Sequence, residues 1–161
     1  MELQQVQEER GGEMTVVTVA QESEGVVEAA ETAREIERIA TTPDWYEPYR
    51  ISQAVKAGGL IHVSGQAGID ERGRTVSDDF LTQGRQAFAN VERVLAAAGA
   101  SLADVVKVGI FVTDMAADLD HVITLRGEFL SEPYPADTLL EVSSLAQPDW
   151  RIEVEVTALA R

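Results

Sequence analysis

Carboxylates are the main side chains of this sequence that can take part in chemistry. The chain has no cysteine, which excludes thiol nucleophiles, disulfides and thiolate metal ligands. Its two histidines, His62 and His121, are too few for a metal site built from several imidazoles, so no metal site is expected. Ser64-Gly65-Gln66 does not have the G-x-S-x-G pattern of a serine nucleophile. Nucleophilic catalysis by a serine or a cysteine therefore has little support in this sequence.

The composition indicates one soluble domain with an acidic surface. The 161 residues are 45% hydrophobic and carry a formal net charge of −15, which repels phosphate backbones, so no nucleic-acid partner is expected. No apolar run approaches the roughly 18 residues that a membrane span needs. The start, MELQQVQEERGGE, does not have the pattern of a signal peptide. These features predict a cytoplasmic protein without membrane contact; a salt-adapted host would also give such an acidic surface.

Residues 1–34 differ in composition from the rest. They contain eight Glu against Arg10 and Arg34, a net charge of −6, and Gly11-Gly12 interrupts any early helix. This favours a mobile acidic N-terminal extension ahead of a domain at 35–161. The alternative is that one piece, a strand at 14–19 or a helix at 23–38, docks on the domain.

Strand and helix patterns follow from residue 35. A short segment at 36–39 precedes a turn, and apolar runs at 51–56 and 60–65 around Ala57-Gly58-Gly59 predict a β-hairpin. Apolar residues at a spacing of three to four then predict a helix at 79–98, with Asp78 or Asp79 as its cap and Gly99 as its end. Gly84 falls on the apolar face of this helix, where it would let a neighbouring element approach closely.

The second half of the chain predicts the remaining elements. A buried strand at 105–113 leads to a helix that Thr113 or Asp114 caps and that ends near residue 130. Strands at 137–142 and 151–160 close the chain. The order β-ββ-α-β-α-ββ predicts an α+β fold, with a mixed sheet and two helices on one face. Val55, Val63 and Val105 are expected on the other face, which would then have to meet another chain.

Three segments appear in a recognisable order. They are SQAV at 52–55 with GGLIHVSGQ at 58–66, VLAAAGASLADVVK at 94–107, and YPA at 134–136 before Glu141-Val142. Together they resemble the Rid family, the YjgF-like reactive-intermediate deaminases, over about residues 35–161. The resemblance implies a chorismate-mutase-like (YjgF-type) fold and a homotrimer with a central barrel and small-molecule clefts between subunits. It also implies hydrolysis of enamines or imines without a metal or organic cofactor.

The resemblance also assigns site residues, and several depart from the family pattern. After Pro-Ala the family has an arginine that pairs with the substrate carboxylate, whereas this chain has Asp137, which would repel an acid. A family tyrosine and asparagine correspond to Ile51 and Ile123. A frequent cysteine corresponds to Leu139, whose backbone can still serve a ligand.

One family residue with a catalytic assignment is retained. Glu153 corresponds to the glutamate that positions the attacking water and is therefore the catalytic candidate. The simpler interpretation is that Glu153 faces solvent or pairs with Arg151. Ser64 and Gly65 belong to the signature itself and are expected to line the cleft.

The charge of the cleft depends on where the side chain of Asp137 lies. Beside Glu153 it would favour a cation or an amine over an acid; otherwise it lies on the surface or accepts a backbone N–H. Arg126, one turn after Ile123, would restore a guanidinium from the helix side, and Arg50 is a second candidate.

The sequence therefore leaves two main functional hypotheses. The first is a Rid-type homotrimer that hydrolyses a reactive imine or enamine other than a standard 2-imino acid. The second is a non-catalytic trimer that binds a small molecule or a partner protein. A third, ribonuclease activity, is disfavoured by the charge of −15 and by the lack of a histidine pair.

Overall fold

The computed structural model of the chain describes residues 35–161. The expectations for residues 1–34 lie outside these residues. The helix considered at 23–38 is wrong at its described end, because Glu37–Ile39 form strand β1. This strand pairs with β2 in antiparallel register, so its backbone groups are used by the sheet.

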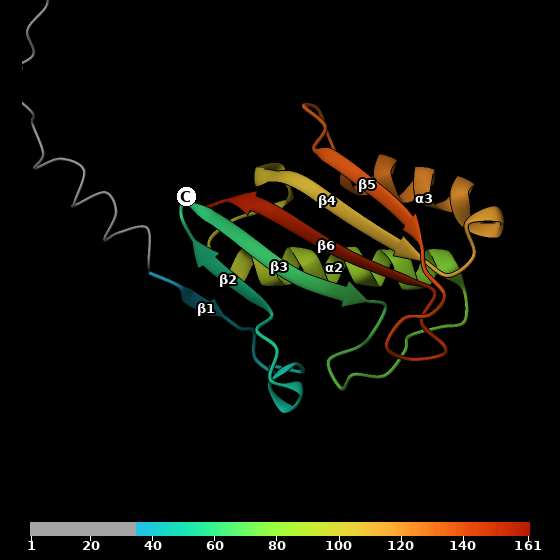
Figure 1. Ribbon diagram of the computed structural model, residues 1–161, viewed down its shortest axis with the longest axis horizontal. Helices are drawn as coiled ribbons and strands as arrows, with labels where there is room; N and C mark the ends of the chain where they lie inside the picture. Colours follow the sequence, from blue (N-terminus) through green and yellow to red (C-terminus); the bar gives the residue numbers. More distant parts are fainter. Residues whose placement is uncertain (1–34) are drawn as a thin grey trace, which may run out of the picture. The chain divides into compact units, whose positions relative to one another are not determined.

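Six strands form one mixed sheet in the order β1-β2-β3-β6-β4-β5 (Figure 1). Their bounds beyond β1 are β2 Ala54–Ala57, β3 Leu60–Ala67, β4 Val105–Val112, β5 Ala136–Glu141 and β6 Ile152–Leu159. The neighbours are antiparallel except β4 and β5, which are parallel. This topology confirms the predicted element order.

The hairpin of β2 and β3 turns at Gly58 and Gly59, whose φ angles of 57° and 79° suit a two-residue turn. The first strand of the hairpin is shorter than predicted. It begins at Ala54, after the short 3₁₀ turn η1 (Glu47–Tyr49), so Ile51 lies in the connection.

Two helices, α2 (Phe80–Ala97) and α3 (Met115–Phe129), cover one face of the sheet, here called the helix face. The predicted caps are confirmed: Asp79 accepts the backbone N–H of Thr82 at 2.8 Å and Asp114 that of Ala117 at 3.0 Å. Gly84 has no side chain where α2 meets α3, and a Cβ there would overlap the side chain of Leu125. The close approach expected of Gly84 is therefore confirmed.

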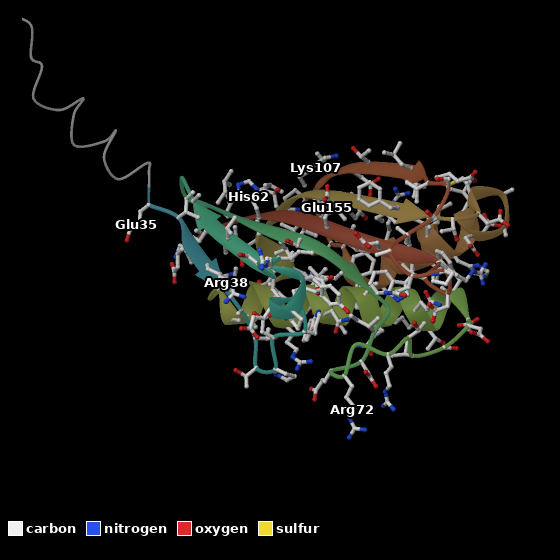
Figure 2. The ribbon with its side chains drawn as sticks, turned by 60° about the horizontal axis from the view of Figure 1, so that its bottom comes forward. Glu35, Arg38, His62, Arg72, Lys107 and Glu155 are labelled. Atoms are coloured by element: carbon white, nitrogen blue, oxygen red, sulfur yellow. The ribbon has the colours of Figure 1, made fainter. Side chains whose placement is uncertain are left out.

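The core lies between the helices and the sheet. Along β6, Ile152, Val154, Val156 and Ala158 are buried against the helices, while the residues between them point to the other face. That other face carries no helix in the described part of the chain and is called the open face. Figure 2 shows His62, Lys107 and Glu155 on it, facing away from α2.

The open face is less apolar than the sequence suggested. Val63 and Val105 belong to the core of the helix face, and only Val55 lies on the open face, opposite His62. The exposed Leu140 and Leu159 add apolar surface to the open face, next to charged Glu153, Glu155 and Lys107. Neither helix among residues 35–161 is long and apolar enough to span a membrane.

Candidate functional site

Glu153 lies on the open face near the start of β6, opposite Ala67 of β3 and Phe111 of β4. Its carboxylate rests on Gly65, since a Cβ added there would lie 2.6 Å from Glu153 Cδ. The β3–β6 register shifts between Val63 and Gln66, so Gly65 sits in an irregularity of the sheet. Irregularities of this kind often aim a side chain at a functional site. A larger residue at position 65 would push the carboxylate away.

The surroundings of Glu153 make its carboxylate more basic. Burial raises the pKa of Glu153, and the negative charge of Glu155, two residues along the same face, raises it further. Glu155 itself is exposed and rests over Gly109. A half-buried carboxylate with a raised pKa accepts a proton from water more readily near neutral pH.

Tyr46 is a residue of this site that is not among the predicted site residues. Its hydroxyl donates to the backbone oxygen of Gly65, under the carboxylate of Glu153. The side chain is buried, and this burial, together with the charge of Glu153, raises the pKa of Tyr46, so its hydroxyl keeps its proton. Trp45, Tyr46 and Tyr49 lie close together in the sequence, and this aromatic cluster is the signal that could have indicated the site. The contact between Tyr46 and Gly65 depends on the fold and cannot be predicted from the cluster alone.

Replacing Tyr46 by Phe is expected to lower the free energy of unfolding by about 1 kcal/mol, because the part-buried carbonyl of Gly65 loses its donor. The same change should lower activity, since Gly65 and the carboxylate above it are held less firmly. Tyr49→Phe is the matched control, because Tyr49 is 67% exposed. Denaturant titration and turnover of both variants check this. Equal behaviour of the two variants would remove Tyr46 from the site.

Ile51 and Ser64 lie beside this group, at the entry to the hairpin. The hydroxyl of Ser64 donates to the backbone oxygen of Ser52 at 2.7 Å, so it holds the loop before β2. Ile51 follows η1 and is 45% exposed.

The other predicted site residues lie on the helix face, at the edge strand β5. Asp137 and Arg126 form a two-pronged ion pair: Nε of Arg126 donates to Oδ2 of Asp137 at 3.0 Å and Nη2 donates to Oδ1. Ile123 lies one turn earlier on α3 and is exposed, and Leu139 packs partly against the core. Asp137 is therefore neither free nor bound to a backbone N–H in this arrangement.

The predicted residues thus fall into two groups on opposite faces of the sheet. Asp137 pairs in the sheet with Val108, whose side chain is in the core, whereas Glu153 pairs with Phe111 on the open face. Within one chain, Asp137 does not lie beside Glu153. Arg151 does not pair with Glu153 either, because its guanidinium binds Asp118.

The histidines are also apart. His62 is exposed on the open face, with Nδ1 3.4 Å from Oγ1 of Thr157. His121 lies on α3, stacked on Phe80 with ring centres 5.8 Å apart. Among residues 35–161 no group of three or more His, Asp and Glu is placed to hold a metal ion.

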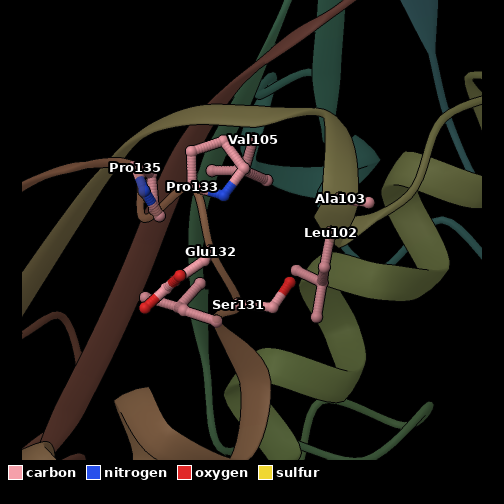
Figure 3. Close-up of a pocket in the computed structure, with 8 residues that line it drawn as sticks. Leu102, Ala103, Val105, Ser131, Glu132, Pro133 and Pro135 are labelled. Atoms are coloured by element: carbon pink, nitrogen blue, oxygen red, sulfur yellow. The ribbon is translucent and has the colours of Figure 1, made fainter.

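A small cavity lies at the end of α3 (Figure 3). Residues of the short turn η2 (Leu102–Asp104), the start of β4 and the loop at 130–135 line it. Its volume of about 50 Å³ is well below the roughly 300 Å³ at which metabolite pockets begin. None of the predicted site residues lines this cavity.

Comparison with known proteins identifies the family to which this fold belongs. The family model described as Endoribonuclease L-PSP matches residues 39–160. The chain is 39% identical over 124 residues to the RutC family protein YjgH of Escherichia coli, covering 74% of this chain and 94% of that one. It is 35% identical over 120 residues, 73% and 92% of the two chains, to a 2-iminobutanoate/2-iminopropanoate deaminase of Dermatophagoides farinae.

Solved structures agree with these sequence matches. The structure titled protein YJGH has a TM-score of 0.71 at 34% identity and covers 78% of this chain and 96% of its own. Rv2704 of Mycobacterium tuberculosis, from the YjgF/YER057c/UK114 family, has a TM-score of 0.67 at 29% identity and covers 78% and 99%. With matching sequence, fold and signature segments, the chain belongs to the YjgF/Rid family, whose model carries the description Endoribonuclease L-PSP.

Proposed function

We propose that this chain assembles as a homotrimer that hydrolyses a reactive imine or enamine lacking a carboxylate, in clefts between subunits. The observation that carries the proposal is the half-buried carboxylate of Glu153, whose raised pKa suits a base that activates water. Some relatives of the chain are named as imine deaminases, which supports the same class of reaction.

Glu153 would act first as a base and then as an acid. Its carboxylate accepts a proton from water while the water oxygen bonds to the C=N carbon, and it passes this proton to the imine nitrogen to give a carbinolamine. Glu153 then takes the hydroxyl proton of the carbinolamine as the C=O bond forms and passes it to the nitrogen, which leaves as ammonia. The net reaction consumes one imine and one water and gives one carbonyl compound and one ammonia.

A site shared between two chains accounts for the arrangement of the predicted residues. Glu153, Gly65 and Ile51 belong to the open face and its edge, while Ile123, Arg126 and Asp137 belong to the α3–β5 edge on the helix face. One chain cannot bring both groups to one ligand, but packing the open face of one chain beside the β5 edge of another can. The uncovered apolar residues of the open face favour such packing.

The charge at position 137 supports exclusion of acids. Because Asp137 binds the fork of Arg126, the pair presents no net positive charge to a substrate carboxylate. A substrate without a carboxylate does not need that charge. Ribonuclease chemistry is less well supported, since His62 and His121 lie on opposite faces of the sheet.

The deciding experiment measures hydrolysis of two imines made in situ. An amine oxidase acting on benzylamine supplies an imine without a carboxylate, and a dehydratase acting on serine supplies 2-aminoacrylate and its imino acid. We expect faster product release than buffer alone with the first and not with the second. Equal acceleration of both would refute acid exclusion. Acceleration of neither would favour the non-catalytic, ligand-binding trimer.

The assembly is checked separately. Light scattering should give a mass three times the 17.5 kDa of one chain. A monomer in solution would rule out a cleft between subunits.

A further inference from the structure

The ion pair between Arg126 and Asp137 joins two elements at the edge of the sheet. Arg126 is in the last turn of α3, and Asp137 is the second residue of β5. Nε and Nη2 of the guanidinium each meet one carboxylate oxygen, which is the two-pronged geometry that arginine adopts with any carboxylate. Asp137 therefore occupies the edge of Arg126 that would otherwise bind the carboxylate of a small molecule.

The pair is accessible and has few other partners. The side chains of Arg126 and Asp137 are 29% and 27% exposed. Within residues 35–161 neither side chain forms a further ion pair. Its surroundings along α3 include the exposed, apolar Ile123. A ligand carboxylate can thus reach Arg126, but it has to displace a carboxylate that the fold holds in place.

We infer that Arg126 is a latent receptor for the carboxylate of a small molecule, and that Asp137 keeps it closed. The inference rests on the proposed function in placing Arg126 at a ligand cleft. Asp137 competes as a tethered carboxylate, which is always present, whereas a free acid must reach the same fork from solution. Residue 137 then determines specificity through Arg126: an uncharged side chain there opens the cleft to acids.

Asp137→Asn tests this with little change of shape. The amide keeps the size of the carboxylate and removes its charge, so Arg126 loses the two-pronged ion pair and keeps its positive charge for another anion. Both side chains are partly exposed, so the loss of their pair should cost the fold little. Asp137→Ser is a second variant that opens the same fork with a smaller side chain, and circular dichroism confirms that both fold.

The chain also supplies a matched control. Arg85 and Glu128 form the same two-pronged pair between α2 and α3, with Nε–Oε2 and Nη2–Oε1 distances of 2.8 and 2.7 Å. Glu128→Gln therefore frees a surface guanidinium in the same way, away from β5. If any freed arginine bound acids, this control would gain affinity too.

The measurement is calorimetric titration of the full chain with pyruvate, an unreactive analogue of a 2-imino acid. Asp137→Asn and Asp137→Ser should bind pyruvate about 10-fold or more tighter than the wild type. Glu128→Gln should match the wild type, and adding Arg126→Gln to Asp137→Asn should abolish the gain. Unchanged affinity in both Asp137 variants, a gain that survives loss of Arg126, or an equal gain in Glu128→Gln would overturn the inference.

The result stands apart from the proposed activity. Hydrolysis does not enter the titration, so a chain that hydrolyses no imine can still show the gain of pyruvate binding. Conversely, absence of the gain leaves hydrolysis of an imine without a carboxylate untouched.

Discussion

Replacing Glu153 by Gln should lower the rate of imine hydrolysis about 100-fold or more, with a much smaller effect on ligand binding. The amide keeps the shape of the side chain but cannot accept a proton from water, and general base catalysis typically contributes at least this factor. The side chain of Glu153 packs over Gly65, which has no side chain, and glutamine has the same size. The substitution should therefore remove the negative charge without moving the backbone. Steady-state rates with the imine from benzylamine measure the loss, which should fall on kcat.

Glu155→Gln is the control for this result. Glu155 lies on the same face of β6, two residues from Glu153, but it is exposed over Gly109. Its removal should leave the rate within a few-fold of the wild type and should lower the pKa of Glu153, because one nearby negative charge is lost. The lower limb of the rate–pH profile should then move to lower pH. A similar loss of rate in both variants would mean that overall surface charge, not Glu153, governs the reaction.

The ionised carboxylate of Glu153 should support activity but lower the stability of the fold. Its pKa in the fold is raised above that of the unfolded chain, so the folded state holds the proton more tightly. Stability from this group is present below the unfolded pKa and is lost as the pH rises through the window up to the raised value. Glu153→Gln removes this loss, so its Tm should exceed that of the wild type above the window and not below it. A group kept at a cost to stability is typical of a functional site.

Regular elements could be predicted because their signals are local. Asp79 and Asp114 cap the helices within one turn, and the apolar spacing from Phe80 onward fixes which face of α2 is buried. The family signature then gave the fold, since its segments occur in the same order in the chain. These features do not depend on how distant parts of the chain meet.

The prediction that Val63 lies on the open face was wrong, although the turn residues of the hairpin contain the information that places it. A two-residue turn at Gly58-Gly59 pairs Ala57 with Leu60, and so pairs Val55 with His62. Val63 then points to the opposite face from Val55. The register of the hairpin, and not the apolar character of the residues, decides which valine reaches the core.

The contacts of the candidate site could not be predicted in the same way. Tyr46 reaches Gly65 across 19 positions, and the pair of Arg126 with Asp137 depends on how α3 packs beside β5. Both Arg126 and Asp137 were predicted from the sequence as ligand-binding candidates, but their pairing with each other was not predicted. Only the packing of the helix on the sheet shows that the two charges neutralise each other.

The ion pair of Arg151 with Asp118 links the start of β6 to α3. Nη2 of Arg151 donates to both oxygens of Asp118, at 3.0 and 2.9 Å. The side chain of Asp118 is 2% exposed, so the carboxylate depends on this guanidinium for most of its compensation, with His121 further away at 3.5 Å. Arg151 also lies over the ring of Phe80, 5.5 Å from its centre.

Arg151→Met should therefore lower the free energy of unfolding by about 3 kcal/mol, because a buried carboxylate is left without its cation. Methionine keeps much of the apolar length of the arginine stem, so lost charge and not lost packing should dominate. Urea titration at neutral pH measures the change. The backbone N–H of residue 151, which donates to Oε1 of Gln83 at 2.9 Å, is unchanged by the substitution and should keep the start of β6 in place.

Two comparisons separate the cost of a buried charge from the loss of an ion pair. Arg85→Met breaks the exposed pair with Glu128 and should cost less than about 1 kcal/mol, since solvent compensates both partners. Adding Asp118→Asn to Arg151→Met should recover part of the lost stability, because the neutral amide is cheaper to bury than an unpaired carboxylate. If the double variant is less stable than Arg151→Met alone, the buried charge is not the cause, and the contact of Arg151 with Phe80 would be the stronger explanation.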